Sequence, residues 1–289
     1  MTEPPMRVHI VSDSTGETGY AVAKATLARF APQEFSLEVS VFIRSETDMA
    51  QTLARLEAMP GPVFHTLARS AHRTRLEAVA QALGVPAVSV LDVPLTAMAA
   101  YLGRAPGDRP GMQHQVNDAY FERIAALDFA IAHDDGALGE RLKAADVILT
   151  GVSRTSKTPT CIYLAYRGIR AANLPLVPGR PIPEAFGQAL SVGVLAVGLT
   201  ASPARLAHVR EQRLEALGDR SPGYAELDQI RDEVAEARLF FERHNLPVID
   251  VTRRSIEETA AAVQALLSAH RAAFAPPRAR GDRAGGERA

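Results

Sequence analysis

The sequence predicts an α/β protein built from two parallel-sheet units. Short apolar stretches alternate with stretches of helical periodicity, the connections between them are short, and the turn-rich segment 103–111 interrupts the alternation. Short apolar strands that alternate with helices form parallel sheets covered by helices on both faces. We therefore expect one such sheet before the interruption and a second one after it.

In the first half, four apolar stretches are expected to be strands, and each is followed by a helical stretch. The expected strands are residues 7–12, 35–43, 62–66 and 87–91. The expected helices are residues 17–30, 47–58, 70–83 and 94–102. Because each strand is short and apolar, this order predicts a parallel sheet.

After the interruption, residues 117–132 have helical periodicity, with Asn117 as the expected N-cap, and the alternation then restarts. The expected strands are residues 146–150, 173–177, 193–200 and 247–251. The expected helices are residues 158–167, 203–217, 224–243 and 255–271. This predicts an α/β domain over 1–104, a linker and helical connection over 105–145, and a second domain over 146–275. Residues 276–289 lack apolar anchors and are expected to be a disordered tail.

Composition narrows the functional class. The chain has 289 residues, enough for two domains with buried cores, and 47% hydrophobic and 22% charged residues fit a globular protein. A formal net charge of −1 gives no reason to expect a nucleic-acid or membrane partner. Cys161 is the one cysteine, expected to be a small buried apolar residue in a reducing cytoplasm. We find no signal peptide and no stretch near the ~18 apolar residues of a membrane helix, so we expect a cytoplasmic protein.

The stretch G-V-S-R-T-S-K-T, residues 151–158, lies between an expected strand and an expected helix. A phosphate loop needs that setting, because backbone N–H groups and a helix N-terminus then face the anion. Ser156 departs from the pattern G-x-x-x-x-G-K-[ST], which weakens the match without excluding it, because serine can fit there if φ is negative. The alternative is an ordinary turn whose Ser and Thr residues cap the helix. The loop predicts a P-loop nucleotide-binding domain, kinase-like, over 146–275.

Six motifs occur in an order that resembles one family. They are V-S-D-S-T-G-E-T (11–18), R-P-G-M-Q-H-Q (109–115), H-D-D-G (133–136), G-V-S-R-T-S-K-T-P (151–159), P-L-V-P-G (175–179) and S-I-E-E-T (255–259). Over residues 7–270 the chain resembles the bacterial and plastid regulatory proteins of pyruvate, phosphate dikinase, which are bifunctional Ser/Thr kinases and phosphorylases. That family itself carries Ser before the lysine. Ser14 and Glu17 favour this branch over the sister branch that regulates phosphoenolpyruvate synthase, which typically has S-D-G-T-G-I-T.

The resemblance implies two opposed phosphoryl transfers on one threonine of the dikinase. ADP donates its β-phosphate to the threonine, which inactivates the dikinase, and inorganic phosphate attacks the phosphothreonine and releases pyrophosphate, which reactivates it. Lys157 would neutralise charge on the transferred group and Thr158 would hold Mg²⁺. We expect Lys157 to be open to ligand rather than packed. The diphosphate would be held by Gly151, Val152, Ser153, Arg154, Thr155, Ser156, Lys157 and Thr158.

Two sets of carboxylates are further candidates. Asp134 and Asp135 follow an expected helix and could provide the general base or bind Mg²⁺, or they could belong to a capped helix end and turn. Asp250 ends an expected strand and could reach a metal ion, or it could cap the next helix.

Several other residues have two interpretations. Arg205, Arg210 and Arg213 could clamp phosphate or form a solvated helix face. Residues 12–18 could bind phosphate or phosphothreonine, or cap a helix. His114 could act as an acid or base, although a lone loop histidine is more often neither.

Two other functions stay open from the sequence. One is a small-molecule P-loop kinase, and the other is a nucleotide-sensing module without catalysis. The oligomeric state is open, and a homodimer is compatible with the sequence.

Overall fold

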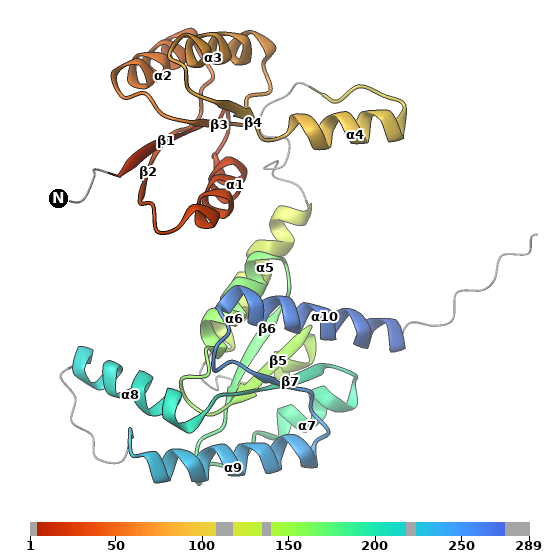
Figure 1. Ribbon diagram of the computed structural model, residues 1–289. Coiled ribbons are helices and arrows are strands. Elements are labelled where there is room, and N and C mark those ends of the chain that lie inside the picture. Colours follow the sequence, from red (N-terminus) through yellow and green to blue (C-terminus); the bar gives the residue numbers. More distant parts are fainter. Residues whose placement is uncertain (1–4, 108–117, 135–139, 218–223, 275–289) are drawn as a thin grey trace, which may run out of the picture. The chain divides into compact units, whose positions relative to one another are not determined.

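The computed structural model describes residues 5–107, 118–134, 140–217 and 224–274. The chain divides into two compact units, Met1–Gln115 and Val116–Ala289 (Figure 1). The segment around His114, Asp135 and the tail from residue 276 lie outside the described residues. Each unit contains one four-stranded parallel sheet, which confirms the predicted α/β class with two parallel sheets.

In the N-terminal unit the strands lie in the order β2-β1-β3-β4. Their bounds are β1 (Met6–Val11), β2 (Phe35–Ser40), β3 (Val63–His65) and β4 (Ala87–Ser89). The helices are α1 (Glu17–Leu27), α2 (Glu46–Ala58), α3 (Ser70–Ala82) and α4 (Asp92–Leu102), with the short 3₁₀ helix η1 (Ala28–Phe30) after α1. β2 ends earlier than the apolar pattern predicted, and Phe42 beyond it has a φ of 56°, which is not compatible with a strand.

Two apolar clusters cover the two faces of this sheet. Val8, Ile10 and Phe64 of the sheet pack with Ala23 of α1. On the other face, Val11 and Val63 pack with apolar residues of α2 and α3, namely Met49, Leu53, Leu56, Leu76 and Ala80. Helices therefore cover both faces, as expected for parallel strands joined by crossover helices.

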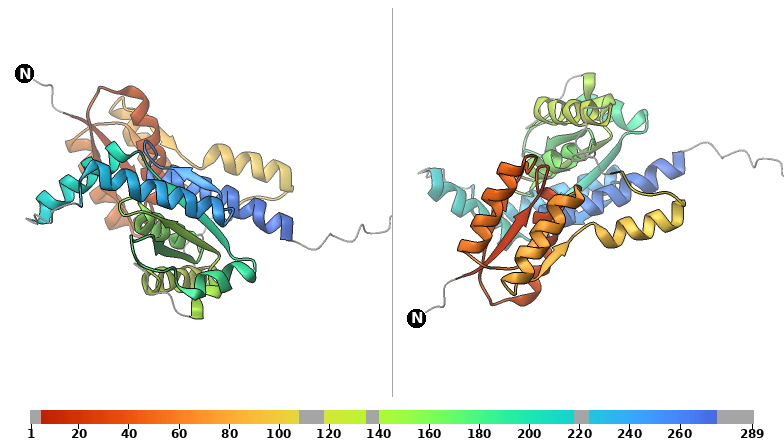
Figure 2. Two further views of the ribbon diagram at one scale, coloured as in Figure 1. Left: turned by 90° about the horizontal axis from the view of Figure 1, so that it is seen from below. Right: turned by 90° about the horizontal axis from the view of Figure 1, so that it is seen from above.

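In the C-terminal unit the order is β6-β5-β7-β8. The strands are β5 (Val147–Gly151), β6 (Ala171–Pro175), β7 (Leu195–Thr200) and β8 (Val248–Asp250). The helices are α5 (Asp118–Ala132), η3 (Glu140–Ala144), α6 (Lys157–Tyr166), α7 (Glu184–Ser191), α8 (Pro203–Leu217), α9 (Leu227–Arg243) and α10 (Ile256–Phe274). In Figures 1 and 2, α6 and α10 lie together on one side of the sheet and α7 and α9 on the other.

Sequence periodicity did not predict α7 or η3. Helix α7 follows the segment P-G-R-P-I-P, whose prolines and glycine indicate a loop. The helix forms because Phe186 and Ala189 are buried against Ile148 and Ala172 of the sheet. Tertiary packing therefore decides this element. On the same face, Gly198 of β7 allows the ring of Phe241 to lie flat on the strand, since a Cβ there would be 2.8 Å from the ring.

The two sheets share one topology. In each unit the second strand in sequence lies on one side of the first, and the third and fourth lie on the other side. The connections therefore leave the first and third strands in opposite directions. Ligands of open α/β sheets bind at such a switch point, beyond the carboxyl ends of the strands. This point lies between β5 and β7 in the C-terminal unit and between β1 and β3 in the N-terminal unit.

Candidate phosphate-binding site

The loop that connects β5 to α6 starts at the switch point of the C-terminal sheet. Every residue of β5 is buried, and Gly151 ends the strand with a φ of 150°. A Cβ at Gly151 would lie 2.2 Å from the carbonyl oxygen of Leu199 on β7. Only glycine therefore allows the two strands to approach this closely where the loop begins. The Gly151 carbonyl accepts a hydrogen bond from Leu176 N at 3.0 Å, which places the segment after β6 beside the loop.

Two residues of the loop have a left-handed backbone. Arg154 has a φ of 69° and Ser156 a φ of 59°, so Ser156 does not have the negative φ that we expected serine to need for this position. Serine adopts the conformation that glycine provides in the usual pattern, at a cost of about 1–2 kcal/mol. Left-handed residues turn successive N–H groups toward one side and so form an anion-binding concavity. Ser156 is also the N-cap of α6, and its side chain makes no capping hydrogen bond.

Lys157 is packed, contrary to our expectation. It is 6% exposed, and its Nζ donates a hydrogen bond to the Val152 carbonyl at 2.8 Å. Thr155 Oγ1 donates to the same carbonyl at 3.0 Å. The Lys157 side chain therefore reaches from the first turn of α6 back to Val152 at the start of the loop. A ligand in the loop would compete with the Val152 carbonyl for the ammonium group.

Asp134 lies beside the first turn of α6. Its Oδ1 accepts hydrogen bonds from Thr158 Oγ1 at 2.9 Å and from Asn173 Nδ2 at 2.7 Å. The backbone N–H of Asn173 on β6 donates to the His133 carbonyl at 2.9 Å, which holds the end of α5 against the sheet. His133 itself is 3% exposed, donates from Nδ1 to the Phe129 carbonyl and stacks on the Phe129 ring. The structure thus joins Asp134 to Thr158 and gives His133 a packing role.

Arg210 braces the first half of the loop. It is fully buried in α8, and its guanidinium binds both carboxylate oxygens of Glu233 on α9, at 3.1 and 2.6 Å. Its NH2 also donates to the Ser153 carbonyl at 3.4 Å, and its NH1 donates to the Tyr224 carbonyl at 3.0 Å. The Tyr224 hydroxyl lies 3.0 Å from Ser153 Oγ and accepts a hydrogen bond from Arg154 Nε at 3.3 Å. Arg210 and Tyr224 thereby attach the loop to α8 and α9.

The other two arginines of α8 do not share this role. Arg205 and Arg213 are exposed, as the solvated-face interpretation predicts. Arg210 is therefore not a solvated residue, and its guanidinium is bound by Glu233 and by the Ser153 and Tyr224 carbonyls. A buried guanidinium with a bidentate carboxylate partner is a fixed structural element.

Asp250 caps a turn at the end of β8. It accepts hydrogen bonds from the Thr252 backbone N–H and hydroxyl, and these bonds hold the pKa of its carboxyl below the usual value. Thr252 Oγ1 in turn accepts a bond from Ser202 N at 2.9 Å. β7 separates β8 from β5, so the ends of these strands are about 10 Å apart. The structure does not bring Asp250 beside Thr158.

The N-terminal loop, residues 12–18, lies at the equivalent switch point of its own sheet. Ser12, Asp13 and Ser14 are buried. Ser12 Oγ accepts hydrogen bonds from Ser14 N and Thr66 Oγ1, and Asp13 accepts one from Ala68 N at 2.7 Å. These bonds connect the ends of β1 and β3 and give the Ser12 and Asp13 side chains a structural role.

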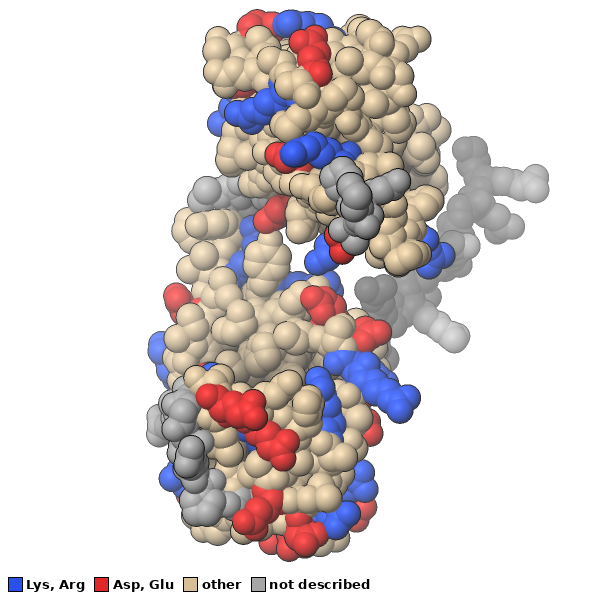
Figure 3. All heavy atoms as spheres, turned by 60° about the vertical axis from the view of Figure 1, so that its left-hand side comes forward, with Lys and Arg blue, Asp and Glu red and all other residues tan. Residues whose placement is uncertain are grey.

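The cysteine, the possible metal ligands and the surface charges can also be compared with the expectations. Cys161 is buried as predicted, and burial raises the pKa of its thiol. Among the described residues we find no group of three or more His, Cys, Asp or Glu side chains suited to hold a metal ion, and no helix long and apolar enough to cross a membrane. On the face drawn in Figure 3, each unit carries charges of both signs.

Sequence reasoning missed Asn173, Tyr224 and Glu233 as neighbours of the loop. Asn173 gave a usable signal, because it is a polar residue inside the apolar strand A-A-N-L-P. Tyr224 and Glu233 gave none, since they are 71 and 80 residues from Ser153 and look like ordinary positions of a polar helix.

Comparison with known proteins identifies relatives over almost the whole chain. The family model described as "Kinase/pyrophosphorylase" matches residues 8–264. A protein of Caulobacter vibrioides is 49% identical over 265 residues, covering 91% of this chain and 84% of the relative. A protein of Hyphomonas neptunium is 44% identical over 273 residues, covering 92% and 98%. Both are named "Putative pyruvate, phosphate dikinase regulatory protein". The resemblance seen in the motifs is confirmed, and the chain belongs to the kinase/pyrophosphorylase family.

Proposed function

We propose that the chain regulates pyruvate, phosphate dikinase by ADP-dependent phosphorylation of a threonine and by phosphate-dependent removal of that phosphoryl group. The names of the relatives support the partner, and the family name supports the pair of opposed reactions. The observation that carries the proposal is the loop after β5, with left-handed Arg154 and Ser156, which leads into the N-terminus of α6, where the Ser156 side chain makes no capping hydrogen bond. That geometry suits a diphosphate.

The loop fits phosphate groups by its chemistry. Backbone N–H groups of residues 153–158 would bind the diphosphate oxygens, and Lys157 would exchange the Val152 carbonyl for the terminal phosphoryl group. A bound Mg²⁺ would neutralise charge on the phosphates, and the Thr158 hydroxyl would hold that ion, which leaves Asp134 beside it to act as a base. Asp250, which is hydrogen-bonded to Thr252, is less suited to this role.

The forward reaction requires a base near the acceptor hydroxyl. In our proposal the threonine oxygen attacks the β-phosphorus of ADP, the bond to the bridging oxygen breaks, AMP leaves, and the threonine proton passes to Asp134. In the opposite reaction an oxygen of inorganic phosphate attacks the phosphothreonine phosphorus. Pyrophosphate leaves as the threonine oxygen takes back a proton from Asp134. Asp135, the other candidate base, lies outside the described residues.

The test is incubation with ADP labelled at the β-phosphate and either purified dikinase or purified phosphoenolpyruvate synthase. Label on a dikinase threonine supports the proposal. Label on the synthase alone assigns the same chemistry to the sister branch. Label on a metabolite indicates a small-molecule kinase, and ADP binding with no transfer indicates a non-catalytic nucleotide-binding module.

A further inference from the structure

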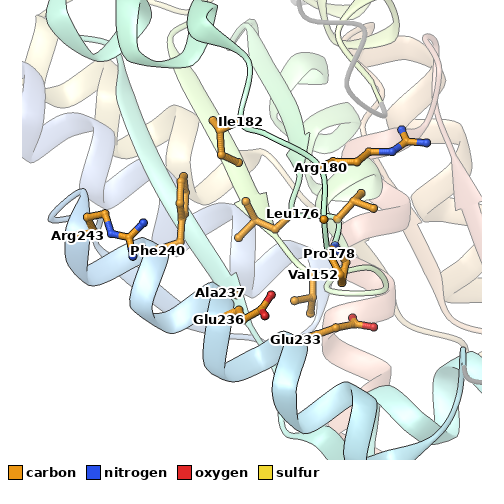
Figure 4. A pocket seen from close by; sticks show the side chains of 12 residues that line it. Val152, Leu176, Pro178, Arg180, Ile182, Glu233, Glu236, Ala237, Phe240 and Arg243 are labelled. Carbon is orange, nitrogen blue, oxygen red and sulfur yellow. The ribbon is translucent and has the colours of Figure 1, made fainter.

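A pocket of about 270 Å³ lies beside the loop, between the segment after β6 and helix α9 (Figure 4). Figure 4 shows Phe240 on α9 facing Leu176 and Ile182, while Arg180 extends away from them. The apolar walls are formed by Val152, Leu176, Val177, Pro178, Ile182, Ala237 and Phe240. Charges of both signs surround these walls, from Arg180, Arg243, Glu236 and Glu233, the last of which is paired with Arg210.

The position of the pocket relative to the loop indicates which end of a bound diphosphate it adjoins. In a phosphate loop the lysine contacts the terminal phosphoryl group. Here Lys157 Nζ lies 2.8 Å from the Val152 carbonyl, and Val152 also lines the pocket. Because Lys157 would exchange this carbonyl for the terminal phosphoryl group, we expect that group to lie near Val152 and therefore next to the pocket. In phosphoryl transfer the attacking oxygen approaches in line, opposite the leaving group, so the acceptor arrives at this end and the adenosine lies at the other.

The size and chemistry of the pocket fit one side chain better than a nucleoside. Its volume is below the roughly 300–1,000 Å³ of pockets that hold drug-sized ligands. Two backbone N–H groups of its wall are already used, since Leu176 N donates to Gly151 O and Arg180 N donates to Val177 O. Such a wall selects for apolar shape rather than for the hydrogen-bonding edge of a base.

We propose that this pocket receives an apolar side chain of the acceptor protein, located within a few residues of the threonine that is phosphorylated. An extended chain advances about 3.3–3.6 Å per residue, so a residue two or three positions from the threonine reaches a pocket adjoining the loop. The inference rests on the proposed function and adds to it a determinant of acceptor specificity.

Two substitutions that narrow the pocket from opposite sides provide the test. Val177→Trp enlarges a half-exposed wall residue, and Ala237→Leu enlarges a buried one on α9. Val192→Trp is the matched control, because Val192 is exposed at the end of α7 and does not line the pocket. For each full-length protein, the dissociation constants for ADP and for the dikinase are measured, together with kcat and KM for labelling of the dikinase.

Excluding one buried apolar side chain is expected to weaken acceptor binding about 10- to 100-fold. We expect KM for the dikinase to rise by that factor in both pocket variants, with ADP affinity and the control within about twofold of wild type. Unchanged KM in a folded Val177→Trp protein would overturn the inference. A loss of ADP affinity with normal dikinase binding would also overturn it, because the pocket would then hold the adenosine. If the wild-type chain neither binds nor labels the dikinase, the proposed function fails and this inference fails with it.

Discussion

The buried pair Arg210–Glu233 allows a quantitative test of how the loop is held. The Arg210 side chain is 1% exposed and that of Glu233 is 18% exposed. Removing one partner of a buried ion pair leaves an uncompensated charge and costs about 3–5 kcal/mol. Glu233→Leu leaves the more buried guanidinium of Arg210 without its carboxylate partner, so we expect the free energy of unfolding to fall by about 5 kcal/mol. Arg210→Met leaves a carboxylate that water can reach, so we expect a loss near 3 kcal/mol.

The double variant Arg210→Met/Glu233→Leu separates the ion pair from the shape of the site. Replacing both partners by apolar residues of similar size is often neutral, so its free energy of unfolding should return close to that of wild type. Its affinity for ADP should nevertheless be lower than that of wild type, because Ser153 and Tyr224 have lost the guanidinium that holds them.

Urea unfolding of the full chain, followed by circular dichroism, measures the free energies, and calorimetry measures ADP binding. Losses below 1 kcal/mol in both single variants, or a double variant as unstable as either, would refute the reasoning.

Three other predictions follow from individual side chains. Lys157→Ala should abolish ADP-dependent labelling of the dikinase because it removes the ammonium group that would contact the terminal phosphoryl group, and a parental rate would show that the loop is not the site. Burial holds the pKa of His65 below 6.5 although Glu77 Oε1 lies 3.4 Å away, outside hydrogen-bond geometry. Between this lowered pKa and about pH 6.5, His65 is neutral in the folded chain but protonated in the unfolded chain. The free energy of unfolding of the N-terminal unit should therefore keep its full value above about pH 6.5 and decrease as the pH falls below it. His65→Leu should flatten this dependence in urea titrations at pH 7.5 and 5.5. Cys161 should resist a thiol reagent at pH 8 until the chain unfolds, and rapid labelling of the native protein would contradict its burial.

The sequence predicted the strands, helices and loop positions that depend on residues close together in the chain. Strands such as β5 and helices such as α6 follow from apolar periodicity, and the loop between them follows from its position. Asp134 could also be associated with the loop, since it lies close to it in sequence. The left-handed φ of Ser156 could not be predicted, because serine on its own favours a negative φ.

The sequence could not predict what depends on distant partners. Lys157 turns back to Val152, and a motif does not reveal whether a lysine is packed without its ligand. Arg210 is hydrogen-bonded to Glu233 and to the Ser153 carbonyl, which lie 23 and 57 residues away in the sequence. Of three arginines on one helix, only the packing of α8 on α9 shows which one is buried.

A crystal structure of the full chain with ADP tests the central claim most directly. We predict that the diphosphate lies in the loop after β5, with its oxygens about 3 Å from the backbone N–H groups of residues 153–158. Lys157 Nζ should leave the Val152 carbonyl and contact the β-phosphate. ADP bound at another place, with Lys157 still on Val152, would contradict the account.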